Sequence, residues 1–112
     1  MNKLTNTQIK CIEEMKSKID EARKYDTFDE WILNTDSYLA SRDNPREYLE
    51  NKREYYNNYI KYYENYKNGA VLVGRYGKPT LNALAKRGIV TVIEYEENRK
   101  NGVIDWVKLN NY

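Results

Sequence analysis

The chain has 112 residues, a length that suits one domain built around a hydrophobic core. Charged residues make up 32% of it, but 40% hydrophobic residues and 12 tyrosines supply enough apolar surface to exclude a disordered chain. The formal net charge of +2 is unevenly spread: residues 1–68 carry 12 Lys+Arg and 13 Asp+Glu, whereas residues 69–112 carry 7 and 4. The C-terminal part is therefore the place to look for contacts with nucleic acid.

The sequence contains no histidine and a single cysteine, Cys11. Histidine-based catalysis, the usual zinc sites and an intramolecular disulfide are therefore excluded. Residues 69–80 lack the spacing of a nucleotide-binding P-loop, and Asp26, Asp29 and Glu30 lack that of a calcium loop. We expect no enzyme, no cofactor and no metal.

The segment that opens the chain, residues 1–8, lacks the apolar run of a signal peptide. No stretch approaches the roughly 18 apolar residues that a membrane helix requires. A lone cysteine also fits a reducing compartment. We expect a cytoplasmic protein that does not span a membrane.

The first helix is predicted to begin at Asn6, because Thr5 and Gln8 have the spacing of a capping box. Apolar residues then recur every three or four positions up to about Lys24, which predicts one buried stripe. The stripe consists of Ile9, Ile12, Met15, Ile19 and Ala22, with Cys11 beside it. We expect the Cys11 thiol to be buried and inert.

Two further helices are predicted before the composition changes. Thr27 and Glu30 have capping-box spacing and predict a second helix up to about Ala40. Asn44 can cap a third helix, with proline in its first position, that runs continuously over residues 45–67 and stops at a glycine. The single domain thus divides into a first helix, a helical insert and a C-terminal unit: residues 1–25, 27–68 and 70–112.

Tyrosines dominate the third helix. Two neighbouring rows follow helical spacing: Tyr48, Tyr55, Tyr59, Tyr62 and Tyr66 form one, and Leu49, Tyr56, Ile60 and Tyr63 form the other. In one interpretation the rings pack inward and their hydroxyls reach water. In the other, an exposed face made of Tyr55, Tyr59, Tyr62 and Tyr66 binds a partner, since tyrosine is enriched at interfaces.

The C-terminal unit changes from helical to mixed patterning. An apolar run over residues 70–73 predicts a short strand. Pro79 can start a helix with Leu81, Leu84 and Ala85 on its inner face, and Gly88 can end it in the left-handed conformation. Two strands follow, at about 90–96 and 103–109, and the Asn101-Gly102 turn predicts a hairpin between them.

This order of strand, short helix and hairpin resembles the second half of a winged helix-turn-helix domain. The similarity rests on Thr80-Leu81-Asn82-Ala83-Leu84-Ala85-Lys86-Arg87-Gly88-Ile89-Val90, which matches the run T-L-x-A-L-x-x-R-G-hydrophobic common in that family. The resemblance implies an α+β fold in which this helix is the recognition helix, the hairpin is the wing and residues 6–24 are the first helix. It also implies one core shared by Leu81, Leu84, Ile89 and Trp106 with Ile9, Ile12 and Met15.

The chain departs from the family in one respect, because residues 74–78 leave no room for the usual second helix. That helix normally crosses the DNA backbone, so either the insert from Thr27 to Lys67 supplies the missing support or the unit is an atypical one. With its apolar face inward, the recognition helix should turn Thr80, Asn82, Ala83, Lys86 and Arg87 away from the core. The predicted nucleic-acid-binding residues are Lys78, Thr80, Asn82, Lys86 and Arg87, with Arg99 and Lys100 at the hairpin tip.

Two functions follow from different features. The first is a small regulator that binds double-stranded DNA through the recognition helix and the hairpin tip. The second is an inhibitor that binds a protein through the tyrosine row, for which a homodimer is a further possible partner. A small chain rich in Asn, Lys and Tyr is similar to accessory proteins of phages and mobile elements, among them anti-CRISPR and other counter-defence factors. Their target would be a nucleic-acid-handling protein such as a CRISPR effector.

Overall fold

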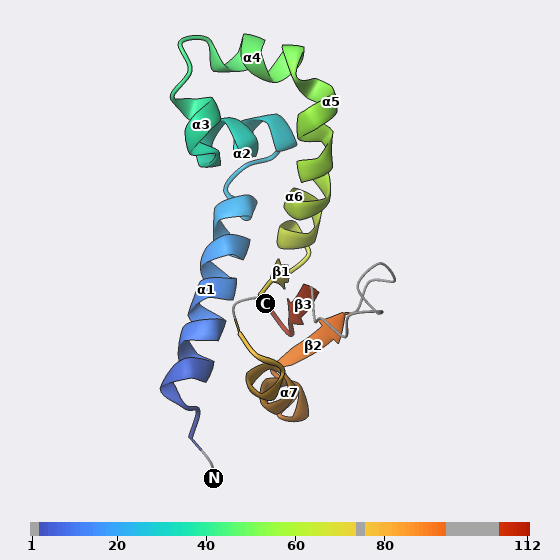
Figure 1. The fold of residues 1–112 in the computed structure, drawn as a ribbon. Coiled ribbons are helices and arrows are strands. Elements are labelled where there is room, and N and C mark those ends of the chain that lie inside the picture. The colour runs from blue at the N-terminus through green and yellow to red at the C-terminus, as the bar shows by residue number, and fades with distance from the viewer. Residues whose placement is uncertain (1–2, 74–75, 94–105) are drawn as a thin grey trace.

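The longest helix, α1 (Asn6–Arg23), runs along one side of an elongated molecule that measures 53 × 30 × 20 Å (Figure 1). The computed structural model describes residues 3–73, 76–93 and 106–112. Short helices gather at the C-terminal end of α1, and a sheet with one further helix gathers toward its N-terminal end. The fold is α+β, as the sequence predicts.

Helix α1 confirms the predicted start. The Gln8 N–H donates to Thr5 Oγ1 at 3.1 Å, and the Thr5 N–H donates to Gln8 Oε1 at 3.0 Å, which completes the capping box. The buried face consists of Cys11, Met15, Ile19 and Ala22. Ile9 was expected on this face but is 39% exposed, because at 100° per residue it lies about 120° from the centre of that face.

The second predicted helix is divided in two, α2 (Phe28–Thr35) and α3 (Ser37–Ala40). Thr27 caps α2 as expected, with its side chain accepting the Glu30 N–H. The continuous helix predicted to Ala40 is wrong because Asp36 takes an extended conformation. Its Oδ1 accepts the Leu39 N–H at 2.9 Å, so the same residue that breaks α2 caps α3.

The tyrosine-rich segment is also not one helix. It consists of α4 (Pro45–Asn51), α5 (Arg53–Tyr56), the 3-10 turn η1 (Asn57–Tyr59) and α6 (Ile60–Lys67). Lys52, with φ −110° and ψ 22°, interrupts the helical backbone. The segment thereby bends over α2 (Figure 1), and the Arg53 guanidinium bridges both carboxylate oxygens of Asp29 at 2.7 and 3.0 Å.

The sheet has three antiparallel strands in the order β1, β3, β2. Their bounds are β1 (Ala70–Leu72), β2 (Val90–Ile93) and β3 (Trp106–Leu109). Val107 in the central strand pairs with Val71 on one side and Val92 on the other. The outer parts of the two predicted hairpin strands and the Asn101-Gly102 turn lie outside the described residues.

Helix α7 (Lys78–Lys86) ends as the sequence predicts. Gly88 has a φ of +73°, its N–H donates to the Ala85 carbonyl, and the Ile89 N–H donates to the Leu84 carbonyl. This pair of bonds is a Schellman motif, in which a left-handed residue satisfies the last carbonyls of the helix. Chain reversal into β2 therefore depends on Gly88.

Two hydrophobic clusters replace the single predicted core. The lower cluster joins α1, the sheet and α7 around Cys11, Met15, Ile19, Leu81 and Leu84, with Ile12 and Ile89 packed against it. The upper cluster joins the end of α1 to the helical insert around Ala22, Trp31, Leu49, Tyr56 and Tyr63. The expected association of Leu81, Leu84 and Ile89 with Met15 is confirmed. Trp106, the first residue of β3, instead faces Tyr62 and Tyr66 at ring-centroid distances of 5.5 and 6.0 Å, because the sheet contacts α6 through the neighbouring strand β1.

Replacing Gly88 by alanine should lower the free energy of unfolding by about 1 kcal/mol. A Cβ at this position would meet no atom within 4 Å, so the cost comes from the backbone alone. Gly88→Asn is the matched variant and should cost less, since asparagine tolerates the left-handed region. Urea unfolding measures both; equal stability of all three proteins would contradict the need for this conformation.

Candidate nucleic-acid interface and aromatic groove

The outer face of α7 carries a polar stripe. Lys78, Asn82 and Lys86 are exposed and follow one another at intervals of four residues, so they lie on one side of the helix over about 12 Å. Leu81 and Leu84 are buried on the opposite side and fix the orientation of the helix. The predicted residues Lys78, Asn82 and Lys86 are therefore brought together.

The other two predicted residues near α7, Thr80 and Arg87, differ in how exposed they are. Arg87 is exposed and follows the last turn, where the helix ends. Thr80 was expected to face away from the core but is half-buried, because it lies four residues before the buried Leu84 and therefore on the same side of the helix. Arg99 and Lys100, the predicted tip of the wing, lie outside the described residues.

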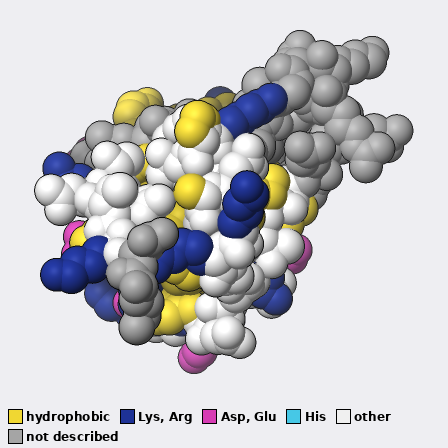
Figure 2. All heavy atoms as spheres, turned by 90° about the horizontal axis from the view of Figure 1, so that it is seen from below, with side chains coloured by type: hydrophobic (Ala, Val, Ile, Leu, Met, Phe, Trp, Pro, Cys, Tyr) yellow, Lys and Arg dark blue, Asp and Glu magenta, His cyan; other side chains and the backbone are white. Residues whose placement is uncertain are grey.

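The end of the molecule that carries α7 is basic. Residues 70–73, 76–93 and 106–112, the described part of the C-terminal unit, contain Lys78, Lys86, Arg87 and Lys108 and no acidic side chain. Figure 2 views this end: Lys and Arg side chains are spread over the face, and Asp and Glu side chains lie mainly toward its rim. The four acidic residues of this unit, Glu94, Glu96, Glu97 and Asp105, lie outside the described residues.

The two tyrosine rows predicted from the sequence have different environments. Leu49, Tyr56 and Tyr63 of one row are buried in the upper cluster. In the other row Tyr55 is 59% exposed, and Tyr59, Tyr62 and Tyr66 are partly buried. The inward-packing interpretation therefore describes Leu49, Tyr56 and Tyr63, whereas of the predicted exposed face only Tyr55 is exposed.

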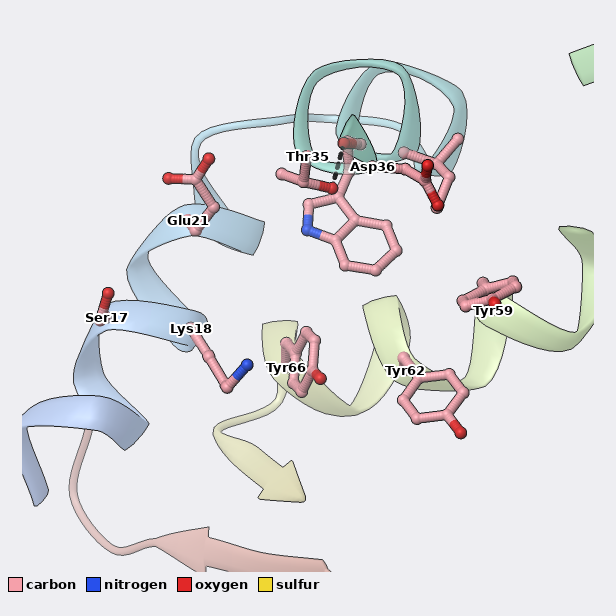
Figure 3. Close-up of a pocket in the computed structure, with 10 residues that line it drawn as sticks. Ser17, Lys18, Glu21, Thr35, Asp36, Tyr59, Tyr62 and Tyr66 are labelled. Atoms are coloured by element: carbon pink, nitrogen blue, oxygen red, sulfur yellow. Dashed lines mark hydrogen bonds between the residues drawn. The ribbon is translucent and has the colours of Figure 1, made fainter. Parts of the chain in front are cut away.

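The partly buried row lines a groove of about 510 Å³ between α1, α2 and the η1–α6 segment (Figure 3). Its residues are Ser17, Lys18, Glu21, Trp31, Ile32, Thr35, Asp36, Tyr59, Tyr62 and Tyr66. The Trp31 ring lies 5.9 Å from that of Tyr66, and the rings of Tyr59 and Tyr62 are 5.8 Å apart. Aromatic side chains from two separate segments thus form the walls.

Three charged side chains determine the electrostatics of this aromatic groove. Lys18 extends from α1 toward Tyr66, with Nζ 5.9 Å from the ring centroid (Figure 3). Glu21 pairs with Lys24 at 3.3 Å, and Asp36 uses one oxygen to cap α3.

The tyrosine hydroxyls of the groove are uncharged. The hydrogen bond with Tyr55, together with burial, raises the pKa of Tyr59 to about 12. Burial also raises the pKa of Tyr66, so both hydroxyls stay neutral at physiological pH.

Sequence reasoning missed the contribution of Lys18, Trp31 and Asp36 to this groove. Trp31, on α2, is buried in the upper cluster. No local spacing indicates that Trp31 meets Tyr66, because the two residues are brought together by the bend in the insert. The extended conformation of Asp36 had a usable signal, since an aspartate can cap a helix that starts with the next residue.

Comparison with protein-family models, curated proteins and solved structures finds no match. Function is therefore inferred from geometry and charge. In the part of the chain that the structure describes, no helix has the length and apolar character to cross a membrane. Over the same residues, no group of three Cys, Asp or Glu side chains is arranged to hold a metal ion.

Cys11 is fully buried on α1, and burial together with the negative charge of Glu14 raises the pKa of its thiol from 9.0 to about 11. At pH 8 the folded protein should hold about 100-fold less thiolate than the unfolded chain, and only the thiolate reacts. Reaction with a disulfide reagent should therefore be at least about 100-fold slower without denaturant than in urea. Because the raised pKa favours the protonated thiol in the folded state, Cys11 should contribute fully to the free energy of unfolding below pH 9. This contribution should decline as the pH rises from 9 to 11. Rapid labelling of the folded protein would contradict this burial.

Proposed function

We propose that the protein binds double-stranded DNA through the end that carries α7, as a small regulator of winged-helix type. The observation that carries this proposal is the exposed stripe of Lys78, Asn82 and Lys86, with Arg87 after it, in a C-terminal part that has 7 Lys+Arg against 4 Asp+Glu over residues 69–112. Lysine and arginine neutralise phosphates, and an asparagine on the same face can read a base edge.

The arrangement around α7 supports this proposal. The chain order of strand, short helix and two antiparallel strands is the order that the winged-helix resemblance implies. The link between β1 and α7 leaves no room for a second helix. The N-terminal part of α1 contacts α7 instead, and it brings the exposed Lys3 and Lys10 to the same end of the molecule (Figure 1). We infer that these lysines contact the DNA backbone in place of the missing helix.

Phosphate contacts of this kind would make the DNA affinity depend on salt concentration. If Lys78, Lys86 and Arg87 each neutralise one phosphate, the logarithm of affinity falls with that of salt concentration with a slope of about −2.7. This corresponds to a loss of roughly 40-fold between 50 and 200 mM salt. Binding of this kind is measurable at low salt and suits a regulator whose contacts are mainly to phosphates.

A second candidate function is protein binding, as an inhibitor such as an anti-CRISPR or other counter-defence factor. The observation that favours it is Tyr55, which is 59% exposed next to the aromatic groove. Large exposed aromatic rings are frequent anchors of protein interfaces. DNA binding would use α7 and protein binding would use Tyr55, so substitutions on one surface at a time distinguish the two candidate functions.

Replacing Lys78, Lys86 and Arg87 together by glutamine should abolish binding to duplex DNA of mixed sequence at 50 mM salt, because it removes three phosphate contacts. Fluorescence anisotropy with labelled duplex measures the loss. The control replaces Lys24, Lys52 and Lys61, which lie on the other half of the chain, by glutamine and changes the net charge equally. Equal losses in both variants would contradict a defined interface on α7.

Replacing Tyr55 by serine should leave DNA affinity within about twofold, since an exposed side chain at the opposite end contributes no phosphate contact. If the protein is instead an inhibitor, the same variant should weaken its retention by a guide-loaded CRISPR nuclease, and the glutamine variant of α7 should not. Co-elution on size-exclusion chromatography measures retention. A DNA affinity that falls tenfold in Tyr55→Ser would contradict the separation of the two surfaces.

A further inference from the structure

The aromatic groove lies away from α7 and has a composition of its own. We propose that it binds the arginine side chain of an extended segment of a partner protein. This inference goes beyond DNA binding and does not depend on it. It rests on the aromatic walls, on the carboxylates at the groove and on a second hollow that continues it.

The walls suit a planar cation. Tyr59 and Tyr62 both line the groove, with ring centroids 5.8 Å apart and planes inclined by 36°. A guanidinium group stacks on aromatic faces because it is flat, delocalised and weakly hydrated. A lysine ammonium has the same charge but lacks the flat surface and the paired N–H groups.

The chain already uses this interaction at neighbouring positions. Arg42 lies over Tyr48 with its guanidinium carbon 4.3 Å from the ring centroid. Lys18 lies over Tyr66 at one side of the groove. Among the described cations, none is placed over the rings of Tyr59 or Tyr62. These two rings are the part of the groove open to a cation from a partner.

The charges favour a cationic occupant over an anionic one. Glu21, Asp36 and Lys18 line the groove, and the ion pair of Glu21 with Lys24 leaves Asp36 as the lining carboxylate that can attract a cation. Asp36 is held in position because one carboxylate oxygen caps α3, and no described cation forms an ion pair with it. Its carboxylate is thus placed to accept N–H groups of a guanidinium. A phosphate-bearing ligand would instead have to approach two carboxylates.

The surroundings favour a peptide over a free small molecule. A second hollow of about 420 Å³ also has Asp36 in its lining and continues along Tyr38, Tyr48, Tyr55 and Tyr56. Tyr55 and Tyr59 connect the two hollows, with hydroxyl oxygens 3.4 Å apart. Tyr38 and Tyr55 are 56% and 59% exposed. An extended chain with arginine in the aromatic groove can therefore place its neighbouring residues along this aromatic surface.

The test is titration of the full chain with the peptide acetyl-Ala-Arg-Ala-amide, followed through the aromatic ¹H–¹³C NMR signals of Tyr59 and Tyr62. The matched probe carries citrulline, which has the shape of arginine without its charge. We expect saturable shifts with the arginine peptide and about three- to tenfold weaker binding of the citrulline peptide, the net contribution of one hydrogen bond. Equal binding of both peptides, or shifts only outside the groove, would overturn the proposal.

Two charge variants sharpen the result. Asp36→Asn removes the carboxylate but keeps a side chain that caps helices equally well, and it should weaken arginine-peptide binding about three- to tenfold. Asp26→Asn, at an exposed carboxylate outside the groove, is the control and should have no effect.

Lys18→Gln should strengthen binding of the arginine peptide, since it removes a like charge. If Lys18→Gln weakens binding and adenosine monophosphate binds in place of the peptide, the groove is an anion site and the proposal fails. The glutamine variant of α7 should bind the peptide normally, so failure of the DNA proposal is distinguishable.

Discussion

Tyr66 is the side chain on which the two halves of this small protein meet. It is packed against both hydrophobic clusters, with its ring 5.9 Å from Trp31 in the upper cluster and 6.0 Å from Trp106 in the sheet. A chain of 112 residues that divides its apolar side chains between two clusters has little core in each, so contact between them is needed for one cooperative unit. Helix α1 and the aromatic chain through Tyr66 provide that contact, and the placement of every surface described above follows from it.

The C-terminal residues reinforce the same junction from outside. Arg23, near the end of α1, donates to the backbone carbonyls of Lys67 and Tyr112, and the Tyr112 hydroxyl donates to Asp20 at 2.7 Å. These hydrogen bonds connect the end of α6 and the C-terminal residue Tyr112 to α1. Each is exposed, so each contributes only modestly to the free energy of unfolding. The sheet and α7 are thereby held at one end of α1 while the groove forms beside its other half. The elongated shape keeps the two candidate surfaces apart.

What the sequence could predict was local. The caps at Thr5, Thr27 and Asn44 and the left-handed glycine at 88 each depend on residues within four positions, and all are observed. The α+β class also followed from the change of patterning near residue 69. The breaks at Asp36 and Lys52 were missed because helical periodicity continues across them, and tertiary packing of the bent segment outweighs propensity. The groove could not be predicted, since it needs α1, α2 and α6 at once. Which of the two tyrosine rows is buried likewise depends on how the segment of residues 45–67 bends.

The two proposed surfaces have opposite charge, and this opposition links the candidate functions. The α7 end offers cations to phosphates, whereas the aromatic groove offers rings and carboxylates to arginine. Arginine is itself the residue that proteins use most to hold phosphate and nucleobases. A nucleic-acid-handling protein therefore presents the two ligands that these surfaces fit, its duplex and the arginines around it. A regulator acting beside another DNA-bound protein and an inhibitor acting on a nuclease place the same demand on the fold, which is to hold both surfaces at a fixed separation. Helix α1 and Tyr66 connect the two surfaces, because Tyr66 packs against both hydrophobic clusters.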